Sequence, residues 1–146
     1  KLFPWYVNFD EKDPDLSAKY GDGSLRERRV THLDDRHLSV ESVLDSRGRK
    51  IVVHYDVTIN PEGFTYDATL TSKDLYKTRR HYAFHETPEG GTRIVVDDDY
   101  RLLKNLYKFL DLFGQGRRML LRSSQEVMQT YLKAAQEELA PKKSST

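Results

Sequence analysis

Residues 94–100, with the sequence IVVDDDY, pass from an apolar run into three consecutive aspartates. Such a group of carboxylates could bind a metal ion, mark the end of a strand, or place one acid inside the protein. On a β-strand, successive side chains point to opposite faces, so the three carboxylates cannot converge on one metal ion. The question is therefore which aspartate faces the interior.

The histidines do not form a metal site at strand spacing. His81 and His85 are four residues apart, which is about 13 Å on a strand at about 3.3 Å per residue. On a helix the same spacing could chelate one ion. Both share an outward face with Lys77 and Arg79, and His54 also points outward. We interpret these residues as solvated surface and expect no metal and no cofactor. The chain also lacks a Ser-His-Asp pattern, a P-loop and a dinucleotide-binding motif.

The 24 basic and 23 acidic residues leave a net charge of +1, which gives no reason to expect a nucleic-acid partner or an anionic membrane surface. Acidic neighbours dilute the basic stretches, which we interpret as a solvated face. Those stretches are Arg26, Arg28 and Arg29, and Lys77, Arg79 and Arg80.

The 146 residues suggest one domain, expected over residues 1–140, with residues 141–146 as a flexible tail. There is no cysteine, so disulfides are excluded. No apolar run approaches the roughly 20 residues of a membrane span, and no signal-peptide pattern is present. We therefore expect a cytoplasmic protein without an integral membrane segment; its oligomeric state stays open.

Segments of alternating polarity, separated by short turns, predict six strands in an antiparallel meander. The expected strands are Ser24–His32, Arg36–Leu44, Lys50–Ile59, Gly63–Leu70, Tyr76–Glu86 and Thr92–Tyr100. The preceding Lys1–Gly23 is expected to be irregular.

Folding each hairpin about its turn predicts the pairing and leaves one consistent apolar face. The second and third strands should pair Leu44 with Ile51, Val40 with Tyr55 and Leu38 with Val57. The next two hairpins should pair Ile59 with Phe64, Val57 with Tyr66, Tyr55 with Ala68, Val53 with Leu70, Leu70 with Tyr76 and Tyr66 with Arg80. The last hairpin should pair Phe84 with Ile94, Tyr82 with Val96 and Arg80 with Asp98. The register of the first strand stays open.

From Leu102 the apolar spacing changes to that of helices. We expect a short helix over 102–113 and a longer one over Arg117–Leu139, which Pro141 stops. The second helix is the natural cover for the apolar face of the sheet. One side of it carries Leu120, Ser124, Val127, Met128, Tyr131, Ala135 and Leu139.

This order of elements resembles the α+β helix-grip fold of the START-like, or SRPBCC, superfamily, which includes polyketide cyclase/dehydrase-like and coenzyme Q-binding-like proteins. The resembling pieces are Trp5, Gly21–Gly23, Gly90–Ile94 and the helix over Arg117–Leu139, so the resemblance covers about residues 5–139. Family members usually begin with a further strand and a helix. We expect that this chain lacks them or closes its sheet differently, which would open part of any cavity.

The resemblance implies a pocket between the curved sheet and the C-terminal helix. We expect Tyr66, Arg80 and Asp98 to form a polar cluster inside it, or alternatively a solvated ion pair at the sheet end. The aromatic residues of this face could be pocket lining or simple core. The expected pocket residues are Tyr55, Phe64, Tyr66, Arg80, Tyr82, Asp98, Ser124 and Met128.

Three functions remain open. The first is binding, and possibly transport, of a hydrophobic small molecule such as a lipid, polyketide or quinone. The second is a lyase of the cyclase/dehydratase type, in which Asp98, Arg80 and a tyrosine would move protons. The third is a co-chaperone-like protein-interaction module. The family has no shared catalytic motif, so no catalytic residue can be named.

Overall fold

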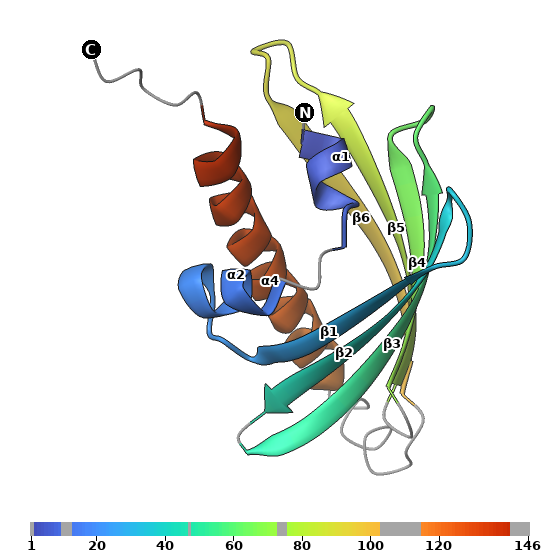
Figure 1. Ribbon diagram of the computed structural model, residues 1–146, viewed down its shortest axis with the longest axis vertical. Coiled ribbons are helices and arrows are strands. Elements are labelled where there is room, and N and C mark those ends of the chain that lie inside the picture. The colour runs from blue at the N-terminus through green and yellow to red at the C-terminus, as the bar shows by residue number, and fades with distance from the viewer. Residues whose placement is uncertain (1, 10–12, 47, 73–75, 103–114, 141–146) are drawn as a thin grey trace.

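The structure, a computed structural model, describes residues 2–9, 13–46, 48–72, 76–102 and 115–140. These residues form two short helices, six strands and a C-terminal helix (Figure 1). Their bounds are α1 (Leu2–Tyr6), α2 (Asp13–Tyr20), β1 (Leu25–His32), β2 (His37–Ser46), β3 (Arg49–Asn60), β4 (Thr65–Ser72), β5 (Tyr76–Glu86), β6 (Thr92–Leu102) and α4 (Gln115–Leu139). The short helix expected over 102–113 and the expected tail at 141–146 lie outside the described residues.

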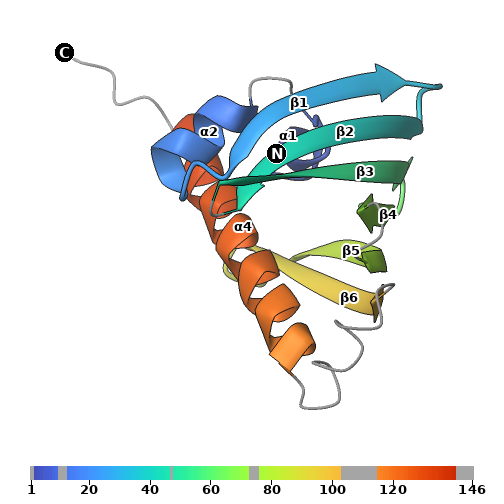
Figure 2. The same ribbon diagram turned by 90° about the horizontal axis from the view of Figure 1, so that it is seen from below.

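The six expected strands are confirmed, each with bounds within two residues of the prediction. They form one antiparallel sheet in the order β1-β2-β3-β4-β5-β6. The sheet twists and curves, and α1, α2 and α4 all lie on its inner side (Figures 1 and 2). The chain is therefore an α+β protein whose helices cover one face of an open sheet.

Two of the four predicted registers are correct. The pairs Val40–Tyr55 between β2 and β3 and Arg80–Asp98 between β5 and β6 occur as expected. The other two hairpins are shifted by two residues, so Tyr66 lies opposite Ile59 and Tyr82 rather than opposite Val57 and Arg80. A shift of two keeps every side chain on its predicted face.

Phe64 explains the first shift. β3 runs to Asn60 and pairs with Thr65, so residues 61–64 form the turn. Phe64 has a positive φ of 50° there, and the residue is 54% exposed. The expected strand position of Phe64, opposite Ile59, is therefore wrong. The second shift arises because β4 continues to Ser72, which pairs with Tyr76.

The segment Lys1–Gly23, expected to be irregular, contains α1 and α2. Asp13 and Pro14 begin α2, where a proline is tolerated because the first turn leaves backbone N–H groups unpaired. Gly23, with a φ of 67°, ends this region, and its N–H donates to the carbonyl of Ser17 at 3.0 Å. A left-handed glycine after a helix is a common C-terminal cap.

The core lies between the inner face of the sheet and the helices. Val53, Val40 and Val57 on the sheet are 0%, 1% and 2% exposed, respectively. On α4, Ala134 and Ala135 are buried, whereas Val127 and Leu139 are 49% and 38% exposed. In its described part the helix therefore packs through small residues and leaves Val127 and Leu139 accessible, although both were expected on the packed side.

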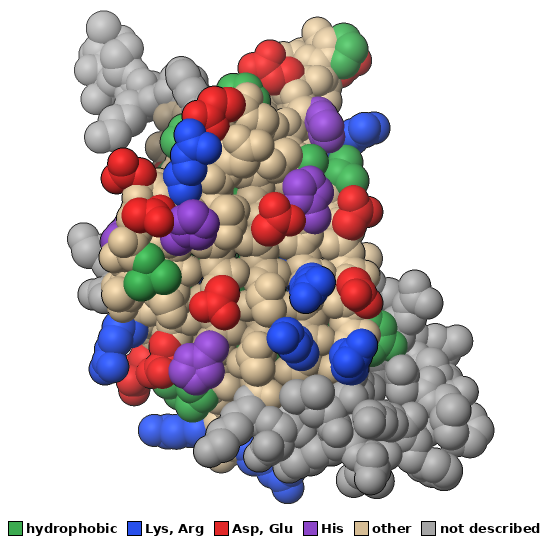
Figure 3. Space-filling model, turned by 90° about the vertical axis from the view of Figure 1, so that its right-hand side faces the viewer, with side chains coloured by type: hydrophobic (Ala, Val, Ile, Leu, Met, Phe, Trp, Pro, Cys, Tyr) green, Lys and Arg blue, Asp and Glu red, His purple; other side chains and the backbone are tan. Residues whose placement is uncertain are grey.

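The outer face of the sheet carries basic, acidic and histidine side chains mixed together (Figure 3). His81 and His54 have side chains that are 42% and 54% exposed, and each lies beside a carboxylate, Asp67 and Glu41. These residues are surface, as the spacing indicated. None of the helices in the described ranges combines the length and apolarity needed to cross a membrane.

Candidate functional site

Two adjoining cavities lie between the sheet and α4. The outer cavity has a volume of about 400 Å³ and is bordered by α2, β1 and α4. The inner cavity, about 130 Å³, reaches the aromatic residues of β3, β4 and β5. The two share five lining residues, so they form one candidate site with an outer and an inner part. The shared residues are Arg28, Leu44, Tyr55, Val127 and Tyr131.

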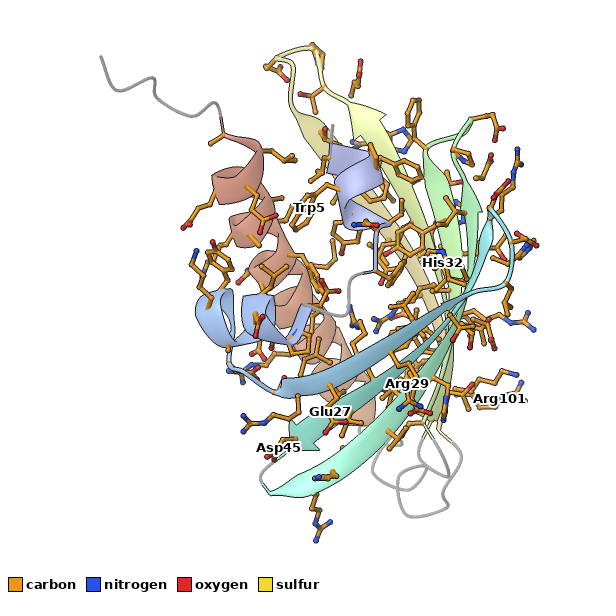
Figure 4. All side chains as sticks on the ribbon, in the orientation of Figure 1. Trp5, Glu27, Arg29, His32, Asp45 and Arg101 are labelled. Atoms are coloured by element: carbon orange, nitrogen blue, oxygen red, sulfur yellow. The ribbon has the colours of Figure 1, made fainter. Side chains whose placement is uncertain are left out.

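A third cavity, of about 410 Å³, lies between α1, α2 and α4. It shares Tyr6, Phe9, Asp13 and Tyr131 with the inner cavity. Trp5 points from α1 toward α4 (Figure 4), and its Nε1 donates to Glu138 at 2.8 Å. This contact holds α1 against the C-terminal end of α4.

A buried polar cluster joins four elements, α2, β1, β2 and α4, where the cavities meet. Asp13 from α2 and Arg28 from β1 form a close ion pair, with side chains only 7% and 8% exposed. The hydroxyl of Tyr131 from α4 lies 2.7 Å from Arg28 Nη1 and 3.0 Å from Asp13 Oδ2, to which it donates. Arg28 Nε also donates to Ser42 Oγ at 3.1 Å. We call these four residues the Arg28 cluster.

The Arg28 cluster keeps its guanidinium charged. Burial alone would lower the pKa of Arg28, but the neighbouring Tyr131 and Asp13 raise it on balance. Burial raises the pKa of Tyr131 well above its ordinary value, so its hydroxyl stays protonated. A buried charge left without its partner is strongly destabilising, which makes Asp13 the necessary counter-ion of Arg28.

The second ion pair is the one predicted from the aspartate run. Arg80 Nε lies 3.0 Å from Asp98 Oδ2, with side chains 14% and 19% exposed. The other carboxylate oxygen of Asp98 accepts a short hydrogen bond from Thr78 Oγ1. Arg80 lines the inner cavity, whereas Asp98 is not among its described lining residues. Asp98 thus supports Arg80 from the edge strand and does not face the cavity.

Aromatic rings dominate the sheet side of the inner cavity. Tyr66 and Tyr82 stack with centroids 4.2 Å apart and planes at 9°. Tyr6 from α1 packs over both rings at 6.1 Å and 6.3 Å. Burial raises the pKa of Tyr55 and Tyr66, and raises the pKa of Tyr76 to about 12. The wall of the inner cavity therefore combines apolar aromatic rings with uncharged hydroxyl groups.

The structure gathers half of the eight expected pocket residues around the inner cavity: Tyr55, Tyr66, Arg80 and Tyr82. Phe64 was wrongly placed in the pocket; it lies in the β3–β4 turn and packs edge-on against Phe3 with centroids 5.7 Å apart. Met128 is half-buried and is not among the described lining residues. The side chain of Ser124 lies outside the described part of α4.

The Arg28 cluster was missed because Arg28 was interpreted as part of a solvated basic face, which is wrong. A signal was present: Arg28 is two residues before Val30, so the two share a face of the strand. The other arginines of this stretch, Arg26 and Arg29, are exposed as expected. Asp13 was missed because α2 was not predicted.

No known protein family matches the chain, and no curated protein is a detectable relative. Among solved structures, the fold is similar to the crystal structure of TTHA0849 from Thermus thermophilus, with a TM-score of 0.65 and 18% sequence identity. The match covers 93% of this chain and 85% of the Thermus chain. At this identity the likeness concerns the fold alone: a six-stranded antiparallel sheet with a C-terminal helix.

Proposed function

We propose that this chain is a helix-grip, START-like domain that binds a hydrophobic small molecule between its sheet and α4. The observation that carries the proposal is the pair of adjoining cavities, about 400 Å³ and 130 Å³, lined jointly by the sheet and the helix. Cavities of a few hundred cubic ångströms with mostly apolar walls and a few polar groups are typical ligand sites.

The chemistry of the walls favours a flat ligand. The inner wall is rich in aromatic rings, including the stacked pair Tyr66 and Tyr82, and tyrosine rings combine an apolar body with a polar edge. A quinone, polyketide or sterol-like molecule combines the same two features. We therefore favour an aromatic or polycyclic ligand over a flexible acyl chain.

The geometry favours binding over catalysis. In the lyase alternative, Asp98 would move a proton, but both of its carboxylate oxygens accept hydrogen bonds, from Thr78 and Arg80. A general base must reach the proton that it removes, and Asp98 does not line the described cavities. We propose a binding or carrier protein for this reason.

The test uses two valine-to-tryptophan variants. Val127 on α4 lines both cavities and is 49% exposed, whereas Val52 on the outer face of β3 is 38% exposed and lines neither. With 2-acetylnaphthalene as the probe in equilibrium dialysis, Val127→Trp should weaken binding by at least about tenfold, which is about 1.4 kcal/mol. Val52→Trp should bind as the wild type does.

Failure of the probe to bind, or equal binding by both variants, would contradict the proposed site. Native mass spectrometry of the protein purified from its own source provides an independent measurement. A co-purifying small molecule would appear in the wild-type spectrum and be depleted in the Val127→Trp spectrum.

A further inference from the structure

The inner cavity contains two guanidinium groups, and each already faces a carboxylate. Arg28 pairs with Asp13, and Arg80 pairs with Asp98. A cavity built to hold an anionic ligand would leave at least one cationic group for the ligand's own charge. Here each cation of the described inner wall has an internal counter-ion, so its charge is balanced within the protein.

The two counter-ions differ in their position relative to the inner cavity. Asp98, on the edge strand β6, is not among the described lining residues, whereas Asp13 lines the inner cavity together with Arg28. The carboxylate of Asp13 would therefore lie beside the charge of any anionic ligand that approached Arg28. The repulsion between the two carboxylates would disfavour such a ligand.

The outer cavity does not supply the missing positive charge. Its other described charged residues are Asp22, Glu126 and Lys133, two carboxylates and one ammonium group. Among the residues that the structure describes here, a ligand carboxylate entering by this route would meet no net positive charge beyond the paired Arg28.

The same walls suit an uncharged ligand with a hydrogen-bond acceptor. Tyr55, Tyr66 and Tyr76 line the inner cavity, and burial raises the pKa of each, so their hydroxyl groups stay protonated. A neutral carbonyl, quinone or ether oxygen can accept from such donors without bringing a charge into the site.

We propose that the site takes an uncharged ligand carrying an acceptor oxygen, and that Asp13, by occupying Arg28, is the residue that excludes carboxylates such as fatty acids. The proposal rests on the proposed function and adds the charge class of the ligand. It assigns a role in specificity to a residue that also joins α2 to β1 and α4.

The test compares two probes of nearly equal shape, 2-acetylnaphthalene, an uncharged ketone, and 2-naphthoate, an anion at neutral pH. The wild type should bind the ketone at least about tenfold more tightly than the carboxylate. Asp13→Asn keeps the size of the side chain but removes its charge. In this variant the affinity for 2-naphthoate relative to that for the ketone should rise by about tenfold or more.

Asp56→Asn, which removes an exposed carboxylate from the outer face of β3, controls for the general change in net charge and should leave both affinities unchanged. If Asp13→Asn does not fold, the double variant Asp13→Asn with Arg28→Gln removes both charges of the ion pair and replaces it in the test. Its ratio of ketone to carboxylate affinity should be smaller than that of the wild type, because the carboxylate of Asp13 no longer repels 2-naphthoate, and an unchanged ratio would overturn the role of Asp13.

Equal binding of the two probes by the wild type, or an unchanged ratio in folded Asp13→Asn, would overturn the charge preference while leaving the binding function intact. Binding of neither probe by the wild type would overturn both. The two proposals therefore fail in distinguishable ways.

Discussion

At Tyr131, one hydroxyl contacts both members of a buried ion pair. It lies 2.7 Å from Arg28 Nη1 and 3.0 Å from Asp13 Oδ2. Tyr131→Phe keeps the ring and its packing, but Arg28 and Asp13 each lose the hydrogen bond that they make with the hydroxyl group. Hydrogen bonds to charged groups contribute about 1.5–3 kcal/mol each. We expect the free energy of unfolding, measured by urea denaturation, to fall by about 2 kcal/mol.

Tyr20→Phe is the matched control. The Tyr20 hydroxyl also contacts a carboxylate, donating to Glu137 Oε2 at 2.8 Å, but this contact is exposed. Exposed polar contacts contribute little, about 0–1 kcal/mol. Equal losses for the two variants would show that the Arg28 cluster is not a special source of stability.

The site residues that could be located from the sequence lie close together along the chain, whereas those that were missed come from distant elements. Arg80 and Asp98 were found because both lie in one hairpin, where a short turn fixes the register. Asp13, Arg28 and Tyr131 come from α2, β1 and α4, and their meeting depends on how the helices pack against the sheet. No local pattern specifies that packing, although the inward position of Arg28 was available from its spacing to Val30.

Among the elements, α2 and α4 meet at a glycine. A Cβ atom built on Gly21 would lie 2.6 Å from Thr130 Oγ1, 3.0 Å from its Cγ2 and 3.1 Å from the carbonyl oxygen of Ser17. Gly21→Ala should therefore push the end of α2 away from α4. Overpacking of this kind costs about 1–3 kcal/mol, and the expected decrease in the free energy of unfolding can be measured by denaturation followed through Trp5, the single tryptophan.

A double variant tests whether contact with Thr130 causes the loss of stability in Gly21→Ala. Thr130→Ala removes both side-chain atoms that a new methyl group at position 21 would meet, so it should recover most of the loss when combined with Gly21→Ala. The close approach of the Ser17 carbonyl remains, so recovery should be incomplete. Additive losses in the double variant would indicate that the two helices do not meet through these residues.

The elements themselves were largely predictable, and the exceptions follow from turn chemistry. Alternation specified six strands because each has one buried face. The β3–β4 turn is longer than expected because Phe64, an aromatic residue typical of strands, adopts a positive φ in the turn. Helices α1 and α2 are too short to show a convincing apolar period, and tertiary packing stabilises them. Phe3, for example, is buried edge-on against Phe84 with centroids 5.2 Å apart.

Over the whole molecule, neutral tyrosines link the sheet to the helices. Burial raises the pKa of five tyrosines on five different elements: Tyr6, Tyr55, Tyr66, Tyr76 and Tyr131. All five line the inner cavity. The protonation state of this group therefore bears on the stability of the entire fold as well as on the site.

The pKa shifts predict loss of stability at alkaline pH. Below pH 10 each tyrosine is protonated in both the folded and the unfolded chain, so its contribution to the free energy of unfolding does not change with pH. Above pH 10 the unfolded chain releases the proton while the folded chain retains it, so the free energy of unfolding falls by about 1.4 kcal/mol per pH unit for each such tyrosine. For Tyr76 this window runs from pH 10 to its folded pKa of about 12.

Tyr76→Phe isolates one member of the group, and the pKa of Tyr76 in the folded protein, about 12, sets the upper end of its pH window. The variant loses a hydroxyl at every pH, so the slope of stability against pH is compared rather than its absolute value. Between pH 10 and about 12, the free energy of unfolding of the variant should fall less steeply than that of the wild type, by about 1.4 kcal/mol per pH unit. Lysines and arginines titrate equally in both proteins, so their contribution cancels in the difference. Parallel slopes would mean that the Tyr76 hydroxyl ionises as freely in the folded protein as in water, and the inner cavity would then be wetter than its aromatic walls imply.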